Sequence, residues 1–457
     1  ETGLSAYDEA KIEFEKEHAL IKNQTAFLTI NCPDGDDPDA VGYQPYTIRN
    51  KSDFLTITEN YMYVGENDNG TKAIKKLFAK EWLRSPDRKE YNRMDCYPNH
   101  AKCPKKVFNT WKPYLMEKVT DYIPNDEALI DLKKIIRAMV NDNEEHAVYF
   151  EKWIAHGIKF PDIKSGICPV LISKQGCGKG TLLKYLKKML GNQKVFETES
   201  PEQHVWGQFN AIIEDAKYIV LDEVGQNETA KKGKFKNLVT EPTITINQKG
   251  MKSYEKSFYG EFILTTNEDN PVNFSKDNRR FVVFKGHTKY KNDRVWWDRN
   301  DAHLEDEAKM KTCYEYFKNI DITPKTMFNL PKPVSEYEKQ LLETNRSSVD
   351  MFAEHLVTTT KQSILDIKKS ALFEMYSEYE PKLKLNYTLS HSRFSLQFNN
   401  LDLKWCRQRM SKGQRYWVID IEAGKKEYQD NDENEAVAVE SCLHDEEEEM
   451  DSDFSFD

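Results

Sequence analysis

The sequence lacks any long hydrophobic run. No apolar stretch among its 457 residues approaches the ~18 residues that a membrane span requires. No hydrophobic core of a signal peptide is present near the first residue. The sequence therefore predicts neither a membrane span nor secretion. A chain of this length provides for several domains with a sizeable core.

Cysteine is also sparse, with eight residues and no dense pairing pattern. This excludes a small disulfide-stapled scaffold and indicates a reducing compartment. Cys96, His100 and Cys103 lie close together, but a structural zinc site needs four ligands and no fourth has suitable spacing. We therefore expect cysteines of an ordinary loop here rather than a metal site.

Positive charge is missing from one end of the chain. The net charge is −10, but residues 427–457 contain fourteen Asp and Glu and no Lys or Arg, so the first 426 residues carry +4. Such asymmetry predicts a mildly basic folded body that handles a polyanion. The low hydrophobicity and high charge of the end of the chain predict an acidic disordered tail.

Glycine is uncommon, with 19 residues in all, so its concentration within residues 173–181 is informative. The apolar run 167–172 before this stretch predicts a buried strand. Leucines at helical spacing in residues 182–190 predict a helix that ends at Gly191. A strand, a glycine-rich loop and a helix in this order are the context that a phosphate-binding loop requires.

The loop supplies candidate phosphate ligands and departs from the usual pattern in two places. Ser173 stands where glycine is usual, and Gly180 follows Lys179 where a Ser or Thr normally holds magnesium, with Thr181 one residue late. The alternative is a glycine-rich turn with a solvated lysine. The predicted cofactor-binding residues are Gly176, Cys177, Gly178, Lys179, Gly180 and Thr181.

Polar residues follow two further apolar runs. Residues 218–221 predict a buried strand that ends in Asp222 and Glu223, and residues 262–266 predict another that ends in Asn267. Open α/β sheets bind ligands at the carboxyl ends of their strands. We expect Asp222 to hold Mg²⁺, Glu223 to polarise the attacking water and Asn267 to bind the γ-phosphate. Surface acids and a turn asparagine are the alternative.

Two arginines, Arg279 and Arg280, immediately precede another apolar run at residues 281–284. Arginine stabilises the charge on a transferring phosphoryl group, often from a neighbouring subunit. The alternative is a pair of arginines that only increase solubility. We count both among the candidate catalytic residues.

A lysine-rich hairpin is predicted between the second and third strands. Residues 243–247 alternate as a strand does, and Gly250 suits a turn. Lys249 and Lys252, with Tyr254 alongside, suit a phosphate backbone, because ammonium groups attract it without reading sequence. An ordinary exposed turn is the alternative.

The last part of the body has a different pattern. Apolar residues between 349 and 398 suggest three helices, and residues 407–421 predict a basic hairpin. Helices followed by a hairpin are the order of a winged helix, which binds nucleic acid or only proteins. We expect five parts: an N-terminal segment of unclear structure (1–50), a mainly helical collar (51–150), a nucleotide-binding domain (151–335), a winged-helix-like domain (345–425) and the acidic tail (426–457). Within them, residues 73–82 and 126–140 have helical periodicity, and residues 285–345 are expected to be charged and helical.

Taken in order, these motifs resemble superfamily 3 helicases. The likeness is greatest to the helicase part of poxvirus-type viral and phage primase-helicases. It is carried by residues 175–181, residues 219–223, the Lys249 hairpin, and residues 264–267 followed by 277–280. It covers about residues 50–420 and is specific in 165–285.

The resemblance implies an α/β fold with a modified AAA+ P-loop ATPase domain that assembles as a homo-hexameric ring. It implies ATP and Mg²⁺ as cofactors, with Thr181 and Asp222 at the metal. Arg279 or Arg280 would act in trans as an arginine finger, and Lys249 would track single-stranded DNA in the pore. Forked duplex DNA, a primase or polymerase and other replication proteins are the implied partners, at an intracellular viral replication site in the host cytoplasm or nucleus.

Two other functions share parts of this pattern. A ring that loads or remodels partners would bind nucleotide and nucleic acid without unwinding. A nucleic-acid packaging motor would share the site chemistry but not the winged helix. A primase active site is not recognisable, and we expect it to be absent, on another polypeptide or upstream of Glu1.

Overall fold

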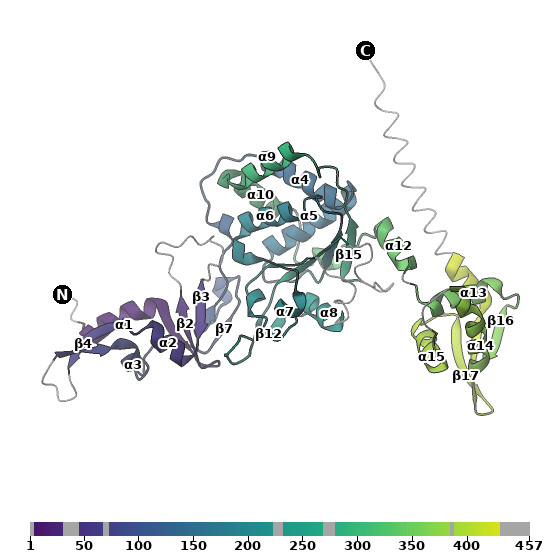
Figure 1. Ribbon diagram of the computed structural model, residues 1–457, viewed down its shortest axis with the longest axis horizontal. Coiled ribbons are helices and arrows are strands. Elements are labelled where there is room, and N and C mark those ends of the chain that lie inside the picture. Colours follow the sequence, from purple (N-terminus) through teal and green to yellow (C-terminus); the bar gives the residue numbers. More distant parts are fainter. Residues whose placement is uncertain are drawn as a thin grey trace, which may run out of the picture. The chain divides into compact units, whose positions relative to one another are not determined.

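The computed structural model describes residues 4–30, 45–66, 73–222, 232–267, 279–344, 346–383 and 388–429. The chain divides into two units, Glu1–Leu341 and Leu342–Asp457, which are described separately below (Figure 1). The division lies close to the start that the sequence predicted for the winged-helix-like domain. Glu223 and the acidic tail from residue 430 lie outside the described residues. Within the described part, no helix combines the length and the apolar character that crossing a bilayer requires.

The first unit begins with a small sheet packed against short helices. The sheet has the order β3-β2-β1-β6, and aromatic side chains such as Phe14, Phe54 and Trp82 form its core. Its elements are α1 (Ala6–Glu17), β1 (His18–Ile21), β2 (Ala26–Ile30), β3 (Tyr46–Arg49), α2 (Lys51–Ile57), α3 (Phe78–Trp82) and β6 (Glu90–Tyr91). The described parts of the segment left unassigned by the sequence, residues 4–30 and 45–50, therefore belong to a mixed α/β layer.

The segment expected to be mainly helical, residues 51–150, contains strands as well as helices. In its described residues, four strands besides β6 pair as β4 with β5 and β7 with β8: β4 (Met62–Glu66), β5 (Ala73–Leu77), β7 (Arg93–Asp95) and β8 (Val107–Asn109). Residues 73–82 were expected to be one helix, but strand β5 and the short helix α3 share them. Short apolar runs do not separate helix from strand, and pairing with β4 decides the outcome. The predicted helix at 126–140 is confirmed as α4 (Glu127–Met139).

A five-stranded sheet forms the centre of the first unit, in the order β10-β11-β14-β9-β15. All four strand pairs are parallel. Both faces are covered, which explains why the strands read as almost continuous apolar runs. The strands are β9 (Cys168–Ile172), β10 (Val195–Thr198), β11 (Tyr218–Leu221), β14 (Glu261–Thr266) and β15 (Phe281–Lys285).

Helices cover the two faces of this sheet. One face packs against a helical layer that Figure 1 shows gathered around α6: α4, α5 (Glu144–Lys159), α6 (Lys179–Leu190), α9 (Arg294–Leu304) and α10 (Glu307–Asn319). On the other face lie α7 (Pro201–His204) and α8 (Lys232–Thr240), where Phe235 contacts Phe262 and Phe281. Because α4 and α5 share one core with the sheet, the predicted boundary between residues 150 and 151 does not separate two cores. Two shorter helices follow, α11 (Thr326–Asn329) and α12 (Glu336–Thr344).

The predicted lysine hairpin is confirmed. Strands β12 (Thr243–Ile246) and β13 (Tyr254–Ser257) pair antiparallel, and residues 247–253 form the tip. Gly250 has φ +76°, in the left-handed region that glycine tolerates without a steric cost.

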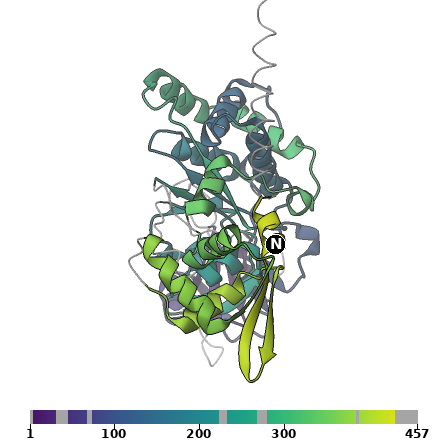
Figure 2. The same ribbon diagram turned by 90° about the vertical axis from the view of Figure 1, so that its right-hand side faces the viewer.

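The second unit combines helices with a three-stranded antiparallel sheet of order β16-β18-β17. The long hairpin of this sheet is drawn in yellow in Figure 2. The predicted helices and hairpin are present, but Ile364, expected in a helix, lies in a strand. Residues 421–429 are helical, so the first positions assigned to the tail belong to a helix. The elements are α13 (Ser348–Thr359), β16 (Ile364–Lys368), α14 (Lys369–Tyr379), α15 (His391–Asn400), β17 (Cys406–Ser411) and β18 (Gln414–Asp420).

Candidate functional site

The carboxyl edge of the central sheet gathers the polar residues predicted from the strand ends. Strand β14 lies between β11 and β9, with Leu264 opposite both Leu221 and Val170. Neighbouring strands are about 4.8 Å apart. Asn267, at the end of β14, therefore lies between Asp222 on one side and the glycine-rich loop on the other.

The glycine-rich loop needs its glycines for two reasons. Gly176 and Gly178 have φ +91° and +104°, in the left-handed region. A Cβ on Gly176 would come within 2.7 Å of the Lys291 side chain, and one on Gly178 within 3.1 Å of Trp297. The segment after β15 therefore lies directly over the loop, an arrangement that the sequence did not predict.

The departure at Ser173 has a structural explanation. Ser173 is not among the residues with positive φ, so its backbone does not require glycine. Its hydroxyl lies 2.7 Å from the Cys177 thiol, across the loop. The loop keeps its turn with a serine in the first position.

Lys179 begins α6 and points into the edge of the sheet. Its Nζ donates to the carbonyl oxygens of Ser173 at 3.3 Å and Thr266 at 3.4 Å, and to Oδ1 of Asn267 at 3.1 Å. All three acceptors are uncharged, so these contacts orient the ammonium group without neutralising it. The first turn of a helix also presents unpaired backbone N–H groups, so this position favours an anion.

Asp222 is fixed by its neighbours. Its carboxylate accepts a hydrogen bond from the Thr265 hydroxyl, and its backbone N–H donates to the Thr198 carbonyl at 2.9 Å. Glu223, predicted to polarise water, lies outside the described residues. The described structure thus places one of the two predicted carboxylates.

These groups line one cleft of about 430 Å³. Its lining residues are Gln175, Gly176, Cys177, Gly178, Lys179, Gly180, Thr181, Leu183, Lys184, Glu197, Asp222, Thr265, Asn267 and Trp297. All six predicted cofactor-binding residues are among them. The cleft therefore brings together the phosphate-binding candidates, Asp222 and Asn267.

The cleft offers oxygen ligands that suit magnesium. Asp222 provides a carboxylate and Thr181 a hydroxyl. Gly180 provides no side chain, and a Cβ added there would meet no atom within 4 Å. No group of three His, Cys, Asp or Glu that could hold a metal occurs in the part of the chain that the structure describes, which includes Cys96, His100 and Cys103. Mg²⁺ is commonly bound by one or two carboxylates together with substrate phosphates and water.

Arg279 and Arg280 lie at the amino ends of the strands, whereas the cleft lies at their carboxyl ends. Strand β15 runs parallel to β9, with Phe281 opposite Cys168 and Lys285 opposite Ile172. The arginines precede β15, whereas the glycine-rich loop follows β9, so five strand residues, roughly 16 Å, separate the two positions. Within one chain the arginines are not part of the cleft.

The hairpin places its predicted residues in two different environments. Lys249 and Lys252 are exposed at the tip. Tyr254, expected beside them as a nucleic-acid contact, is only 6% exposed and its hydroxyl donates to Glu214. The expectation for Tyr254 is corrected, because strand alternation turns its side chain to the buried face of β13.

A buried ionic cluster holds the base of the hairpin. Lys256 on β13 donates to the Asp215 carboxylate and the Thr110 hydroxyl, each at 2.9 Å, and the Tyr46 hydroxyl donates to the same carboxylate. Burial lowers the pKa of the Lys256 ammonium, but the carboxylates of Asp215 and Glu214 outweigh it and leave the pKa raised. Lys256 is therefore charged. It links the hairpin to Asp215 in the loop before β11, and Tyr46 links the same carboxylate to the N-terminal sheet.

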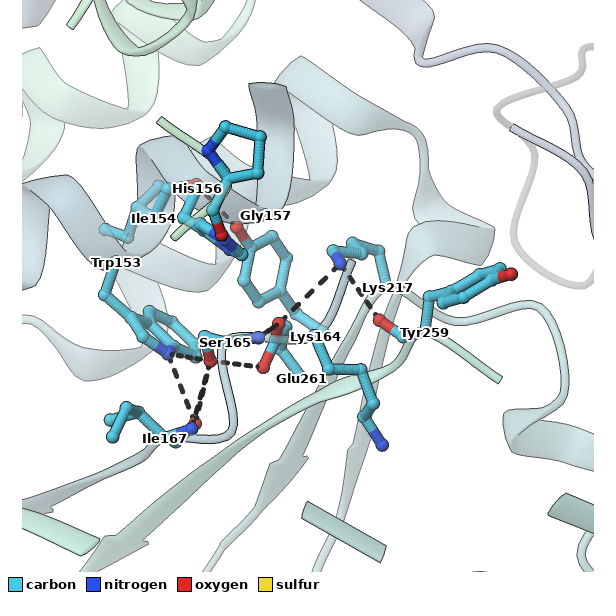
Figure 3. A network of polar contacts seen from close by, with 12 residues as sticks. Trp153, Ile154, His156, Gly157, Lys164, Ser165, Ile167, Lys217, Tyr259 and Glu261 are labelled. Carbon is cyan, nitrogen blue, oxygen red and sulfur yellow. Dashed lines mark hydrogen bonds and ion pairs between the residues drawn. The ribbon is translucent and has the colours of Figure 1, made fainter. Parts of the chain in front are cut away.

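A second polar network lies at the amino edge of the sheet, away from the cleft (Figure 3). The Glu261 carboxylate accepts from the backbone N–H and the hydroxyl of Ser165, both at 2.7 Å, and lies 3.9 Å from the Lys217 ammonium. Trp153 on α5 donates to the Ser165 hydroxyl at 3.0 Å. Burial lowers the pKa of Lys217, and Glu261 acts against it. This network attaches the strands to α5, and we assign it a structural role.

Sequence reasoning missed two kinds of residue in the cleft. Thr265 aligns Asp222, and a threonine inside an apolar strand gives little signal. Trp297 and Lys291 cover the loop from a segment predicted only as charged and helical. The aromatic pair Trp296 and Trp297 within this polar segment was the signal that could have indicated its contact with the loop.

Comparison with known proteins gives one family, one curated relative and several solved structures. Residues 171–280, which include the glycine-rich loop and end at Arg280, match a family described as "Family of unknown function (DUF5906)". The chain is homologous to the DNA primase-polymerase of Nitratiruptor phage NrS-1, with 24% identity over 265 residues, 57% of this chain and 36% of that protein. The chain thus spans about a third of the length of this relative.

Two solved structures of the NrS-1 C-terminal region share the fold. The apo structure of its residues 305–718 has a TM-score of 0.61 and 17% identity, covering 91% of this chain and 99% of that one. The A form apo structure of the same region has the same score and identity, covering 90% and 98%. At this identity the likeness concerns the fold alone.

Proposed function

We propose that this chain is the ATP-hydrolysing part of a viral DNA-replication protein and acts as a helicase of the superfamily 3, AAA+ type. The observation that carries the proposal is the common cleft of the Lys179 loop, Asp222 and Asn267 at one edge of a parallel sheet. Homology to a phage DNA primase-polymerase supports the setting in DNA replication.

Each residue in the cleft has a role that its contacts support. The Lys179 ammonium, held by uncharged oxygens, exchanges them for the β- and γ-phosphates of ATP. Asn267 binds the terminal phosphate from the adjacent strand. Asp222 and Thr181 would hold Mg²⁺, which neutralises charge on the phosphates.

The position of the arginines supports assembly of more than one copy. Arg279 and Arg280 lie at the edge of the sheet opposite their own cleft. An arginine that stabilises the transferring phosphoryl group must then come from a neighbouring copy, as in trans-acting arginine fingers. A head-to-tail interface repeated in this way forms a ring when the rotation between copies closes, and we propose a closed ring of six copies.

The hairpin supplies the proposed contact with single-stranded DNA. Lys249 and Lys252 are exposed at a tip whose base is fixed by the Lys256 cluster. Two ammonium groups on a rigid support attract a phosphate backbone irrespective of sequence. The second unit, with its helices and the β17–β18 hairpin, is proposed as a winged helix that binds DNA or a partner protein.

The test is strand displacement on a forked DNA duplex with ATP and Mg²⁺. We expect the wild-type protein to separate the strands and Lys179→Ala to lower ATP turnover at least about a hundredfold, because a preorganised charge at the phosphates is lost. Lys188→Ala is the matched control, since Lys188 is on the same helix but is paired with Glu305 outside the cleft. Unwinding that persists in Lys179→Ala would refute the assignment.

A ring that loads or remodels partners is the second candidate. The burial of Tyr254 favours it, because the hairpin then offers charge but no stacking surface. Under the helicase proposal, Lys249→Ala stops unwinding and leaves ATP turnover without DNA unchanged. It also reduces the slope of log binding constant against log salt concentration, for single-stranded DNA, by about 0.7 per lost phosphate contact. Unchanged single-strand binding and stimulation by DNA in Lys249→Ala would favour the remodelling ring.

A further inference from the structure

The residues that line the cleft are of two chemical kinds. Asp222, Thr265 and Asn267 contribute oxygen and amide groups. Leu183 and Trp297 contribute apolar surface. Leu183 follows Lys179 by one helical turn, about 6 Å along α6.

Trp297 is the aromatic side chain among the lining residues, and the structure holds it in place. Its indole N–H donates to the Tyr290 carbonyl at 2.8 Å, and its ring packs edge-on against Trp296 with centroids 4.4 Å apart. The edge of the ring approaches Gly178, where an added Cβ would come within 3.1 Å. The indole therefore has one orientation at the start of α6.

Lys184 and Leu183, which also line the cleft, are less suited to contact an uncharged ligand group. The Lys184 ammonium is 2.8 Å from Asp301, and the Leu183 side chain is only 4% exposed. A fixed aromatic ring offers a flat apolar surface, which complements a purine base.

We propose that Trp297 is the surface on which the base of the bound nucleoside triphosphate stacks. The inference rests on the proposed function and adds the source of affinity for the base, as distinct from the phosphates. Trp297 is thereby a specificity-determining residue that selects a nucleotide over a bare polyphosphate, while Lys179 and the loop bind both.

The experiment compares binding of Mg-ATP and of Mg-tripolyphosphate to the full chain by calorimetry. The wild type is expected to bind ATP more tightly than tripolyphosphate. Trp297→Ala is expected to weaken ATP binding about tenfold to a hundredfold, in line with loss of one base-stacking contact, and to leave tripolyphosphate binding unchanged. Trp297→Phe is expected to retain ATP affinity within a few-fold.

The controls separate a base platform from a structural support. Phe328→Ala removes an exposed aromatic ring outside the cleft, 86% exposed, and is expected to change neither affinity. An equal loss of ATP and tripolyphosphate affinity in Trp297→Ala would overturn the inference, because it would mean that the indole only supports the loop. Unchanged ATP affinity would also overturn it. A wild type that binds neither ligand would contradict the proposed function itself.

Discussion

We expect single buried histidines to make this chain sensitive to acid. His18 is 2% exposed and lies among Phe14, Phe54 and Tyr61, with ring centroids 4.4, 5.5 and 5.6 Å away. Burial lowers the pKa of His18 to about 4. Because the unfolded chain binds this proton near pH 6.5, His18 contributes stability that is complete above that pH and is lost as the pH falls toward 4.

We expect His18 to account for about 2 kcal/mol of lost stability between pH 7.5 and pH 5. His18→Phe keeps an aromatic ring but cannot bind a proton, so its melting temperature should fall less over this range than that of the wild type. Thermal unfolding at the two pH values measures the difference. Burial also lowers the pKa values of His146, His156 and His303, so the variant should keep part of the acid sensitivity. Equal decreases in the two proteins would contradict the role of His18.

Individual residues of the cleft and the hairpin differ in how well the sequence predicted them. Lys179 and Asn267 were predicted because glycine spacing and strand ends are visible in sequence, and the structure joins them at 3.1 Å. Trp297 was not predicted, because its approach to Gly178 depends on how the segment after β15 returns over the loop. Tyr254 was misplaced because its strand face depends on which side of β13 is covered.

Among the elements, the lysine hairpin depends on its buried base. Lys256 is 2% exposed and contacts Asp215 and Thr110. Asn210 adds a backbone link, since its side chain donates to the Thr245 carbonyl at 3.0 Å and accepts from the Asn247 N–H at 2.9 Å. These contacts fix the hairpin to the loop that leads into β11 and thus to Asp222.

Lys256→Met is expected to lower the free energy of unfolding by roughly 3–5 kcal/mol, because it leaves buried carboxylates without their cation. Lys249→Met, at the exposed tip of the same hairpin, is the matched control and should change it by no more than about 0.5 kcal/mol. Urea unfolding followed by far-UV circular dichroism compares the two. Equal midpoints for both variants would show that the cluster does not hold the hairpin.

At the scale of the whole molecule, the sequence predicted the strands and helices around the cleft better than the layers that surround it. Apolar runs with polar ends identify β9, β11 and β14, because a doubly covered strand is apolar throughout. The N-terminal sheet was missed because its strands are short and pair with segments distant in sequence, such as β1 with β6. The sequence placed a domain boundary at residue 150 because no local sequence pattern shows that α4 and α5 share a core with the sheet.

In the proposed assembly of the whole molecule, an arginine of another copy would complete the binding of a triphosphate at the Lys179 cleft. The register of β15 against β9 keeps Arg279 and Arg280 away from their own cleft. Two inactive variants, one changed in the cleft and the other in an arginine, should therefore recover ATP hydrolysis when they are mixed. A mixture of two variants that are both changed in the cleft should stay inactive.

The most direct measurement is ATP hydrolysis by a mixture of Lys179→Ala with Arg279→Ala or Arg280→Ala, whichever arginine variant is inactive alone. If copies assort at random in a head-to-tail ring, about one interface in four is intact, and ATP turnover should return to about that fraction of wild type. A mixture of Lys179→Ala and Asp222→Asn is the control and should stay inactive. An arginine mixture no more active than the mean of its two components would contradict the account.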